Sequence, residues 1–385
     1  MHIVVAIDSF KGSLTSLEAG LAVKEAALSL CPNAQVTVCP LADGGEGTVD
    51  ALTAGMGGKL QEVTVTGPLG GPVKACYGIV NGETAVMEMS AAAGITLVPA
   101  DERDPSQTTT YGVGEMIRDA LDRGCKKFIV GIGGSATNEG GAGMLMALGF
   151  QFLDKQGRPV AFGAKGLESL ATISLQKADP RLAGCSFRVA CDVTNPLCGA
   201  NGCSAIFGHQ KGATAQMIPV LDRWMDHYAQ VAAGVSEKAD KDYPGAGAAG
   251  GLGFGFLAFL NAKLEPGIQI VLEETGLEET IKSADLVITG EGRLDAQTVM
   301  GKAPIGVAQL AKKYDKRVIA FSGCVTKDAG ICNAHGIDAY FPIVPGAVTL
   351  EEALNRDNAC RNLKNTATQV FRLLLSLNGI NYAET

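Results

Sequence analysis

The stretch HIVVAIDSFKGSLTSLEAGLAVKEAALSLCPNAQVTVCPLADGGEG, residues 2–47, decides the fold class. Residues 2–8 are a short run rich in β-branched side chains, which indicates a buried strand. Residues 13–30 carry apolar side chains at helical spacing. Residues 34–43 predict a second strand that ends in the loop DGGEG, and a second helix is expected to start near Thr48. Strands and helices that alternate in this way are typical of a parallel sheet with crossover helices.

The same alternation returns after about residue 280, whereas the middle of the chain differs. Residues 62–90 alternate apolar and polar side chains around the turns GPLGGP and NG, which predicts antiparallel hairpins. We therefore expect an α/β fold. A doubly wound domain with a largely parallel sheet would comprise residues 1–62 and 280–385, and residues 63–279 would form an inserted α+β domain. Ligands are expected in the cleft between the two domains. The strand and helix at 127–149 fit either sheet.

The amino-acid composition argues against some classes of protein. Glycine accounts for 50 of 385 residues, nearly twice the average usage of about 7%, and it clusters in loops without a collagen period. The net charge of -8 argues against a nucleic-acid binder. The 11 cysteines contain no C-x-x-C pair, which favours free thiols in a reducing compartment.

The chain starts with a strand pattern instead of a signal peptide, and its apolar stretches are shorter than the roughly 18 residues of a membrane helix. We expect a cytoplasmic protein without a membrane partner, and a homo-oligomer is compatible with this sequence.

Five loops that follow apolar runs combine glycine with acidic or hydroxyl side chains. They are DSFKGS (8–13), ADGGEGT (42–48), GIGGSATNEGGAG (131–143), CDVTNP (191–196) and TGEGRLD (289–295). The carboxyl ends of parallel strands face the ligand crevice of an open α/β sheet. Asp8, Asp43, Asp192 and Glu291 each follow an apolar run, so we expect their carboxylates to reach such a crevice.

The third of these loops supports two interpretations. Residues 131–136 spell G-x-G-x-x-A, a dinucleotide-binding pattern, and Asp154 lies near the position of a ribose-binding acid. However, glycines continue through residues 140–143, where the helix of that motif should be regular. The alternative is an anion-binding nest of successive N–H groups, to which the hydroxyls of Ser135 and Thr137 contribute.

Positive charges accompany the acidic loops. Lys11, Lys211 and Arg293 each lie next to a glycine and can approach an anionic ligand closely. The chain has no Walker A motif, no kinase H-R-D and D-F-G pair, no H-E-x-x-H and no G-x-S-x-G. Carboxylates and cations together are nevertheless what phosphoryl transfer requires, since the transferring group, Mg²⁺ and the attacking hydroxyl each need a partner.

Six segments resemble the bacterial glycerate kinase family that acts on D-glycerate. They are DSFKGSLTS, PLADGGEGTVDAL, GIGGSATNEGGAGM, ACDVTNPLCG, GAGAAGG and LVITGEGRLDAQT, in this order between residue 1 and about residue 345. The resemblance implies an ATP-dependent kinase that converts D-glycerate to 2-phosphoglycerate, with 3-phosphoglycerate as the other product to consider. It also implies a two-domain α/β fold. The family usually has proline at the positions of Ile7 and His209, and residues 321–325 also depart from its pattern.

The resemblance and the loop chemistry together give a set of candidate ligands for ATP and Mg²⁺. The phosphates are expected against the glycine loops at 131–141 and 289–293. Asp295 and Glu46 are the candidate Mg²⁺ ligands, with Asp192 as a further one. The candidate ATP-binding residues are Gly133, Gly134, Ser135, Thr137, Gly290, Gly292 and Lys211.

The remaining assignments concern the reaction. Asp192 or Asp43 is expected to accept the proton of the attacking hydroxyl, and Arg293 or Lys11 to pair with the glycerate carboxylate. Lys11 or Lys211 would neutralise charge on the transferring phosphoryl group. Two other functions stay open from the residues alone: a nicotinamide-dependent oxidoreductase of a small hydroxy acid, and a binding protein that uses its glycine loops as an anion receptor.

Overall fold

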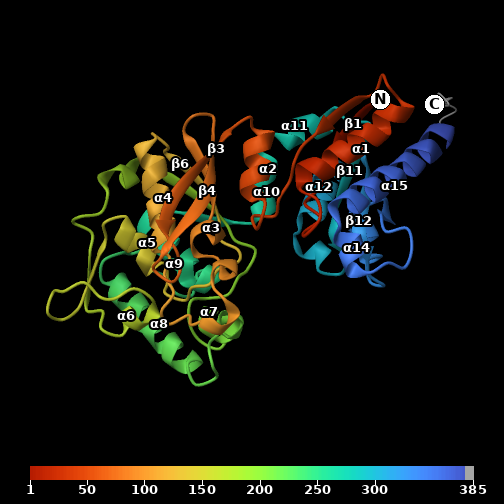
Figure 1. Cartoon of the computed structure of the whole chain (residues 1–385). Coiled ribbons are helices and arrows are strands. Elements are labelled where there is room, and N and C mark those ends of the chain that lie inside the picture. The colour runs from red at the N-terminus through yellow and green to blue at the C-terminus, as the bar shows by residue number, and fades with distance from the viewer. Residues whose placement is uncertain (378–385) are drawn as a thin grey trace. The chain divides into compact units, whose positions relative to one another are not determined.

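The computed structural model describes residues 1–377, which form two compact units (Figure 1). Unit 1 contains Met1–Asp43, Asp50–Met56 and the chain from Ile268 onward. Unit 2 contains Gly44–Val49 and Gly57–Gly267. The two ends of the chain therefore build one unit, and the middle of the chain builds the other. The expected division into two folding domains stays a prediction.

Unit 1 is organised around a five-stranded parallel sheet with the strand order β13-β12-β11-β1-β2. Ile3 of β1 lies opposite Val36 of β2 and Leu286 of β11. The strands are β1 (His2–Val5), β2 (Gln35–Val38), β11 (Leu286–Leu294), β12 (Arg317–Val325) and β13 (Ala339–Pro342). All five correspond to apolar runs of the sequence, and their parallel pairing confirms the expected fold class for this part of the chain.

The helices of unit 1 cover this sheet. Helices α1 and α15 lie side by side (Figure 1) and are joined by ion pairs of Arg356 with Glu18 and of Lys364 with Glu25. Thr15 caps α1 through a capping box with Glu18, which stabilises the helix start. The helices are α1 (Ser16–Leu30), α2 (Thr48–Gly55), α10 (Gly267–Glu274), α11 (Leu277–Lys282), α12 (Ala303–Lys312), α13 (Ile331–Ala334), α14 (Leu350–Leu354) and α15 (Arg356–Leu377).

Unit 2 contains a six-stranded mixed sheet with the order β10-β9-β6-β5-β4-β3. Strands β3, β4 and β5 pair antiparallel, as the alternating pattern predicts, whereas β5, β6, β9 and β10 pair parallel. The strands are β3 (Lys59–Thr66), β4 (Pro72–Val80), β5 (Thr84–Glu88), β6 (Lys127–Gly131), β9 (Ser186–Ala190) and β10 (Lys263–Glu265). The strand of the 127–149 segment therefore belongs to this sheet. A separate two-stranded antiparallel sheet pairs β7 (Gln151–Leu153) with β8 (Thr172–Ser174).

The helices of unit 2 pack around a core of buried apolar side chains that includes Phe128, Phe187 and Phe256. They are α3 (Ser90–Ala93), α4 (Tyr111–Asp122), α5 (Ala142–Ala147), α6 (Ala164–Leu167), α7 (Cys203–Phe207), α8 (Ile218–Ala233) and α9 (Ala248–Leu260). Within residues 1–377, no helix has both the length and the apolar composition needed to cross a bilayer.

Two glycine-rich segments of unit 2 touch through their backbones. Gly250 has a φ of +66°, and a Cβ there would lie 1.9 Å from the carbonyl oxygen of Thr137. The Gly140 N–H donates to the Gly250 carbonyl at 2.9 Å. Only glycine allows this close approach, and the start of α9 thereby supports the loop between β6 and α5.

Candidate functional site

The loop between β6 and α5 presents free backbone amides. Gly133 and Gly134 are exposed. In residues 1–377, no group accepts a hydrogen bond from the N–H of Gly133, Gly134 or Ser135. Gly134 has a φ of +72°, a conformation that glycine adopts without strain. Three successive N–H donors on a backbone without bulky side chains suit an anion such as a phosphate group.

Lys211 supports this loop from behind. Its side chain is 2% exposed, and its Nζ donates to Ser135 Oγ and to the Thr137 carbonyl, each at 2.7 Å. Burial lowers the pKa of Lys211 to about 8. Thr137 Oγ1 is also buried and has no partner in the described residues. Among the candidate ATP-binding residues of this unit, Gly133 and Gly134 are exposed to solvent. The other three, Ser135, Thr137 and Lys211, are buried.

Glu139 anchors the same loop and is not among the residues predicted from the sequence. Its Oε1 accepts hydrogen bonds from Thr110 N at 2.6 Å, from Thr110 Oγ1 at 2.7 Å and from Gly143 N at 3.0 Å. Its Oε2 accepts one from Gly163 N at 2.9 Å. Burial raises the pKa of Glu139 in spite of these donors. An acidic residue inside a glycine-rich run was the available sequence signal for this role.

Two further predicted loops of unit 2 lie against this one. A Cβ on Gly131 would lie 2.5 Å from the carbonyl oxygen of Gly44, and a Cβ on Gly44 would lie 2.5 Å from Cβ of Ala190. The loop that carries Glu46 is therefore packed against the ends of β6 and β9. Asp192 follows β9, is exposed, and accepts a hydrogen bond from Gly267 N at 3.0 Å.

Unit 1 brings together the other acidic loops. The Lys11 ammonium lies 3.6 Å from Asp43 Oδ2 and is 57% exposed. Partial burial lowers the Lys11 pKa, but Asp43 and Asp8 outweigh this effect and raise it above its ordinary value. Gly292 lies against the backbone of this first loop, since its Cβ would be 3.4 Å from Lys11 N.

Asp8 and Glu291 lie at the ends of neighbouring strands of unit 1. Asp8 N donates to the Gly290 carbonyl at 2.9 Å, which extends the parallel pairing of β1 and β11. Burial and the nearby Asp43 carboxylate raise the pKa of Asp8 to about 7. Burial also raises the pKa of Glu291, which accepts a hydrogen bond from Thr298 Oγ1 at 2.7 Å. Lys302, which the sequence analysis did not select, lies 3.6 Å from Glu291.

Two other predicted site residues of unit 1, Arg293 and Gly290, have contacts within the protein that account in part for their residue types. Arg293 Nε lies 3.1 Å from Asp295 Oδ2, and the arginine side chain is 65% exposed. Gly290 is buried, and a Cβ there would lie 2.1 Å from the carbonyl oxygen of Phe321. Close packing of β11 on β12 therefore requires a glycine at 290 irrespective of any ligand.

The described residues offer single carboxylates, and no complete set of side-chain ligands, to a metal ion. Among residues 1–377, no group of three or more His, Cys, Asp or Glu side chains is arranged to hold a metal ion. Mg²⁺ in nucleotide sites is held by one or two carboxylates together with phosphate oxygens. Asp295, whose side chain is largely buried, and the exposed Glu46 each fit such a role without a complete protein cage.

The geometry does not support the dinucleotide-binding interpretation of residues 131–136. Helix α5 starts only at Ala142 and has 6 residues, so no regular helix directly follows residues 131–136. Asp154 lies in the turn after β7, where it accepts hydrogen bonds from Gln156 N, Arg158 N and Arg158 Nε. The Asp154 carboxylate therefore stabilises its own turn through these hydrogen bonds instead of binding a ribose.

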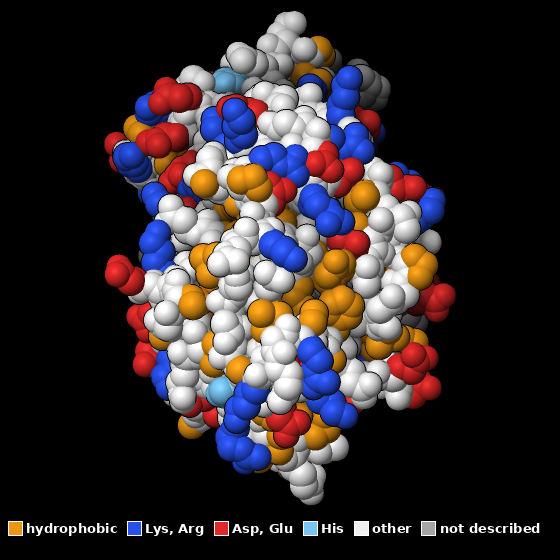
Figure 2. Space-filling model, turned by 90° about the vertical axis from the view of Figure 1, so that its left-hand side faces the viewer, with side chains coloured by type: hydrophobic (Ala, Val, Ile, Leu, Met, Phe, Trp, Pro, Cys, Tyr) orange, Lys and Arg blue, Asp and Glu red, His pale blue; other side chains and the backbone are white. Residues whose placement is uncertain are grey.

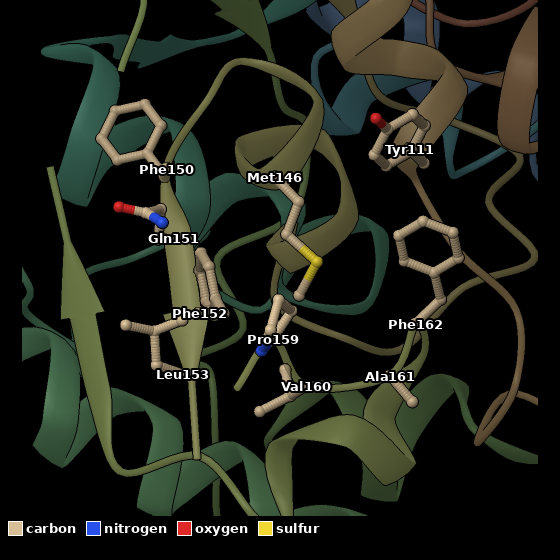
Figure 3. Close-up of a pocket in the computed structure, with 10 residues that line it drawn as sticks. All are labelled: Tyr111, Met146, Phe150, Gln151, Phe152, Leu153, Pro159, Val160, Ala161 and Phe162. Atoms are coloured by element: carbon tan, nitrogen blue, oxygen red, sulfur yellow. The ribbon is translucent and has the colours of Figure 1, made fainter. Parts of the chain in front are cut away.

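A cavity of about 450 Å³ lies elsewhere in unit 2 (Figure 3). Strand β7 borders it on one side, and the rings of Tyr111 and Phe162 lie 4.9 Å apart on the other. Figure 2 shows hydrophobic side chains exposed at the surface on one face of the molecule. The cavity contains none of the predicted site residues and no charged side chain, so it does not suit a triphosphate. Its lining is Tyr111, Met146, Phe150, Gln151, Phe152, Leu153, Pro159, Val160, Ala161 and Phe162.

Comparison with known proteins gives consistent matches over the whole chain. A model of the glycerate kinase family matches residues 3–375. A glycerate kinase of Haemophilus influenzae is 50% identical over 375 residues, which cover 97% of this chain and 99% of that protein. The glycerate 2-kinase of Escherichia coli is 50% identical over 370 residues, 95% of this chain and 97% of that protein.

A solved structure also matches. The crystal structure of a protein described as glycerate kinase 2 from Salmonella typhimurium LT2 superimposes with a TM-score of 0.91 at 46% identity. The match covers 99% of this chain and 100% of that one.

The raised pKa of Asp8 makes stability depend on pH. The folded chain holds a proton on Asp8 up to pH about 7, whereas the unfolded chain releases it near pH 4. Stabilisation by this proton is complete below about pH 4 and is lost as the pH rises to about 7. Asp8→Asn removes this loss, so the variant should gain on the order of a few kcal/mol relative to the parent protein between these values.

Urea unfolding of both proteins at about pH 4.5 and about pH 7.5 measures this difference. Asp357→Asn, an exposed carboxylate of the same unit, is the control and should show little change. An equal stability difference between Asp8→Asn and the parent protein at both pH values would show that Asp8 has an ordinary pKa.

Proposed function

The chain belongs to the glycerate kinase family, and on this premise we propose that it transfers the γ-phosphoryl group of ATP to O2 of D-glycerate. Phosphorylation of glycerate is the activity that the family and its relatives carry, and ATP is the phosphate donor that a kinase implies. The D configuration, the choice of O2 over O3 and the use of Mg²⁺ are the parts that we propose.

The free amides of Gly133, Gly134 and Ser135 carry the proposal for the ATP site. A kinase must hold phosphate oxygens whose charge increases or shifts during transfer, and fixed N–H dipoles do so without reorganisation. Lys211 and Thr137 lie behind these amides and keep them in place. Gly290 and Gly292 belong to the second glycine loop, which we propose contacts ATP as well.

The acidic and basic side chains have different proposed roles in the reaction. Asp192 or Asp43 accepts the proton of the attacking hydroxyl, and the exposed Lys11, in preference to the buried Lys211, neutralises charge on the transferring group. Arg293 or Lys11 pairs with the glycerate carboxylate. The exposure of Asp192, Lys11 and Arg293 supports these roles, because each side chain is open to a ligand.

Mg²⁺ would be held by the ATP phosphates, with Asp295 or Glu46 as the protein ligand. When bound, the ion would withdraw charge from the phosphate oxygens. The side chains of this protein do the rest of the work: the amide nest orients the phosphates, and the carboxylates take up the proton.

The oxidoreductase alternative has no support from the family model or from the relatives. The turn contacts of Asp154 agree with its rejection. Cytoplasmic location and assembly into a homo-oligomer stay predictions.

One assay with product analysis tests the function. Purified protein with ATP, Mg²⁺ and D-glycerate should release ADP, and phosphorus NMR should show 2-phosphoglycerate as the product. L-glycerate and omission of Mg²⁺ are the controls, and both should give little ADP. A phosphorus signal of 3-phosphoglycerate would overturn the assignment of O2, and equal rates with and without Mg²⁺ would remove the ion from the proposal.

The role of Asp192 is tested by Asp192→Asn. The substitution keeps the size of the side chain and its ability to accept a hydrogen bond from Gly267 N, but it removes the basic carboxylate. Loss of a general base lowers kcat by about 100-fold or more. An unchanged kcat would exclude Asp192 as the base and leave Asp43, for which Asp43→Asn is the matching variant.

A further inference from the structure

The Asp8 carboxyl group is a buried polar side chain with one unused oxygen. Asp8 is 3% exposed, and its Oδ1 accepts a hydrogen bond from Ser9 N at 2.7 Å. No other hydrogen bond and no ion pair of Asp8 exists in residues 1–377. Oδ2 accepts no hydrogen bond in residues 1–377 and is not one of the fully buried side-chain atoms that lack a partner, so this oxygen is open to a ligand.

The neighbours of Asp8 do not supply that partner. Lys11, the nearest cation along the chain, pairs with Asp43 instead. Glu291, at the adjoining position of β11, is occupied by Thr298 and Lys302. The charged groups that act on Asp8 are Asp43, Lys11 and Glu291, and none of these three donates a hydrogen bond to Asp8 Oδ2.

A second polar group close by also lacks a partner. Thr289 Oγ1 is buried and has no hydrogen bond in the described residues. Thr289 and Glu291 are two positions apart on β11, so their side chains lie on the same face of the strand. Since the pairing of β1 and β11 continues to Asp8, this face is the one next to the Asp8 carboxyl group. An open carboxylate oxygen of Asp8 and the exposed ammonium of Lys11 at one sheet end describe a site for a small hydroxylated acid.

We propose that Asp8 is a substrate-binding residue that accepts a hydrogen bond from the O3 hydroxyl of D-glycerate, while Lys11 holds its carboxylate. The inference rests on the proposed function, because O2 is there the reacting oxygen and O3 is the hydroxyl left to be recognised. Carboxylate, O2 and O3 are adjacent in glycerate, so one small site can contact all three. Asp8 thereby selects a dihydroxy acid over a monohydroxy acid.

The test compares two ligands that differ only in this hydroxyl. D-lactate has a methyl group where D-glycerate has the hydroxymethyl group that carries O3. The inhibition constant of D-lactate and the KM of D-glycerate are measured for the parent protein, Asp8→Ala, Asp8→Asn and the control Asp357→Ala. The constants are measured at about pH 8.5, where the Asp8 carboxyl group is ionised, and loss of a hydrogen bond to a charged group weakens binding by about 10- to 100-fold. Asp8→Ala should therefore raise the KM of D-glycerate by this factor and leave the D-lactate constant and the KM of ATP within about twofold.

Asp8→Asn keeps a polar group of the same shape and should restore part of the preference for D-glycerate. If Asp8→Ala does not fold, this variant decides, and a preference reduced by about threefold or more supports the proposal. Equal weakening of both acids, or no change in either, would overturn it. Absence of any D-glycerate-dependent ADP release in the parent protein would instead count against the proposed function, since the Asp8 comparison then has no substrate to select.

Discussion

The buried carboxylate of Glu139 is the constraint on which the glycine loop of unit 2 depends. A loop rich in glycine loses much conformational entropy when it becomes ordered, so something must hold it. Glu139 accepts hydrogen bonds from Thr110, Gly143 and Gly163 and has no cation as a partner in the described residues. Lys211 ties Ser135 and the backbone of Thr137 from the same side. The amides of residues 133–135 are therefore preorganised instead of merely flexible, as an electrostatic site requires.

The two units supply different kinds of chemistry. Besides the carboxylates of Asp192 and Glu46, unit 2 offers backbone N–H groups, whose partial charges do not change with pH. Unit 1 offers titratable groups: Asp8 and Glu291 have raised pKa values, and Lys11 is exposed beside Asp43. Fixed dipoles suit the highly charged phosphates of the donor. Carboxyl groups suit the hydroxyls of the acceptor, because they accept hydrogen bonds from them.

Much of the fold follows from the sequence pattern. The β-branched run at 2–8 and the first strand of the alternation that returns after about residue 280 became neighbouring parallel strands, and the alternating residues after 62 became hairpins. The sheet to which residues 127–131 belong did not follow, because strand pairing depends on contacts that are remote in sequence. Helices α8 and α15 were not among the expected elements either, although both are amphipathic.

The site residues themselves stay predictions. Glycine-acid loops led to Gly133, Asp43 and Asp8, because strand ends in a parallel sheet converge. The sequence could not show that Lys211 is buried and donates to Ser135, or that Asp154 accepts hydrogen bonds from residues of its own turn. Both facts depend on side-chain contacts. Gly290 illustrates another limit of pattern reading. Its conspicuous position in TGEGRLD is explained by the close approach of β12.

Hydrogen exchange with and without ligands tests the central division between the two units most directly. A non-hydrolysable ATP analogue with Mg²⁺ should slow exchange of the amides at 133–135, which have no acceptor in the described residues. D-glycerate alone should slow exchange in residues 8–13 and leave 133–135 unchanged. Protection of 133–135 by D-glycerate, or unchanged exchange there with the ATP analogue, would contradict the assignment of the phosphates to the glycine loop.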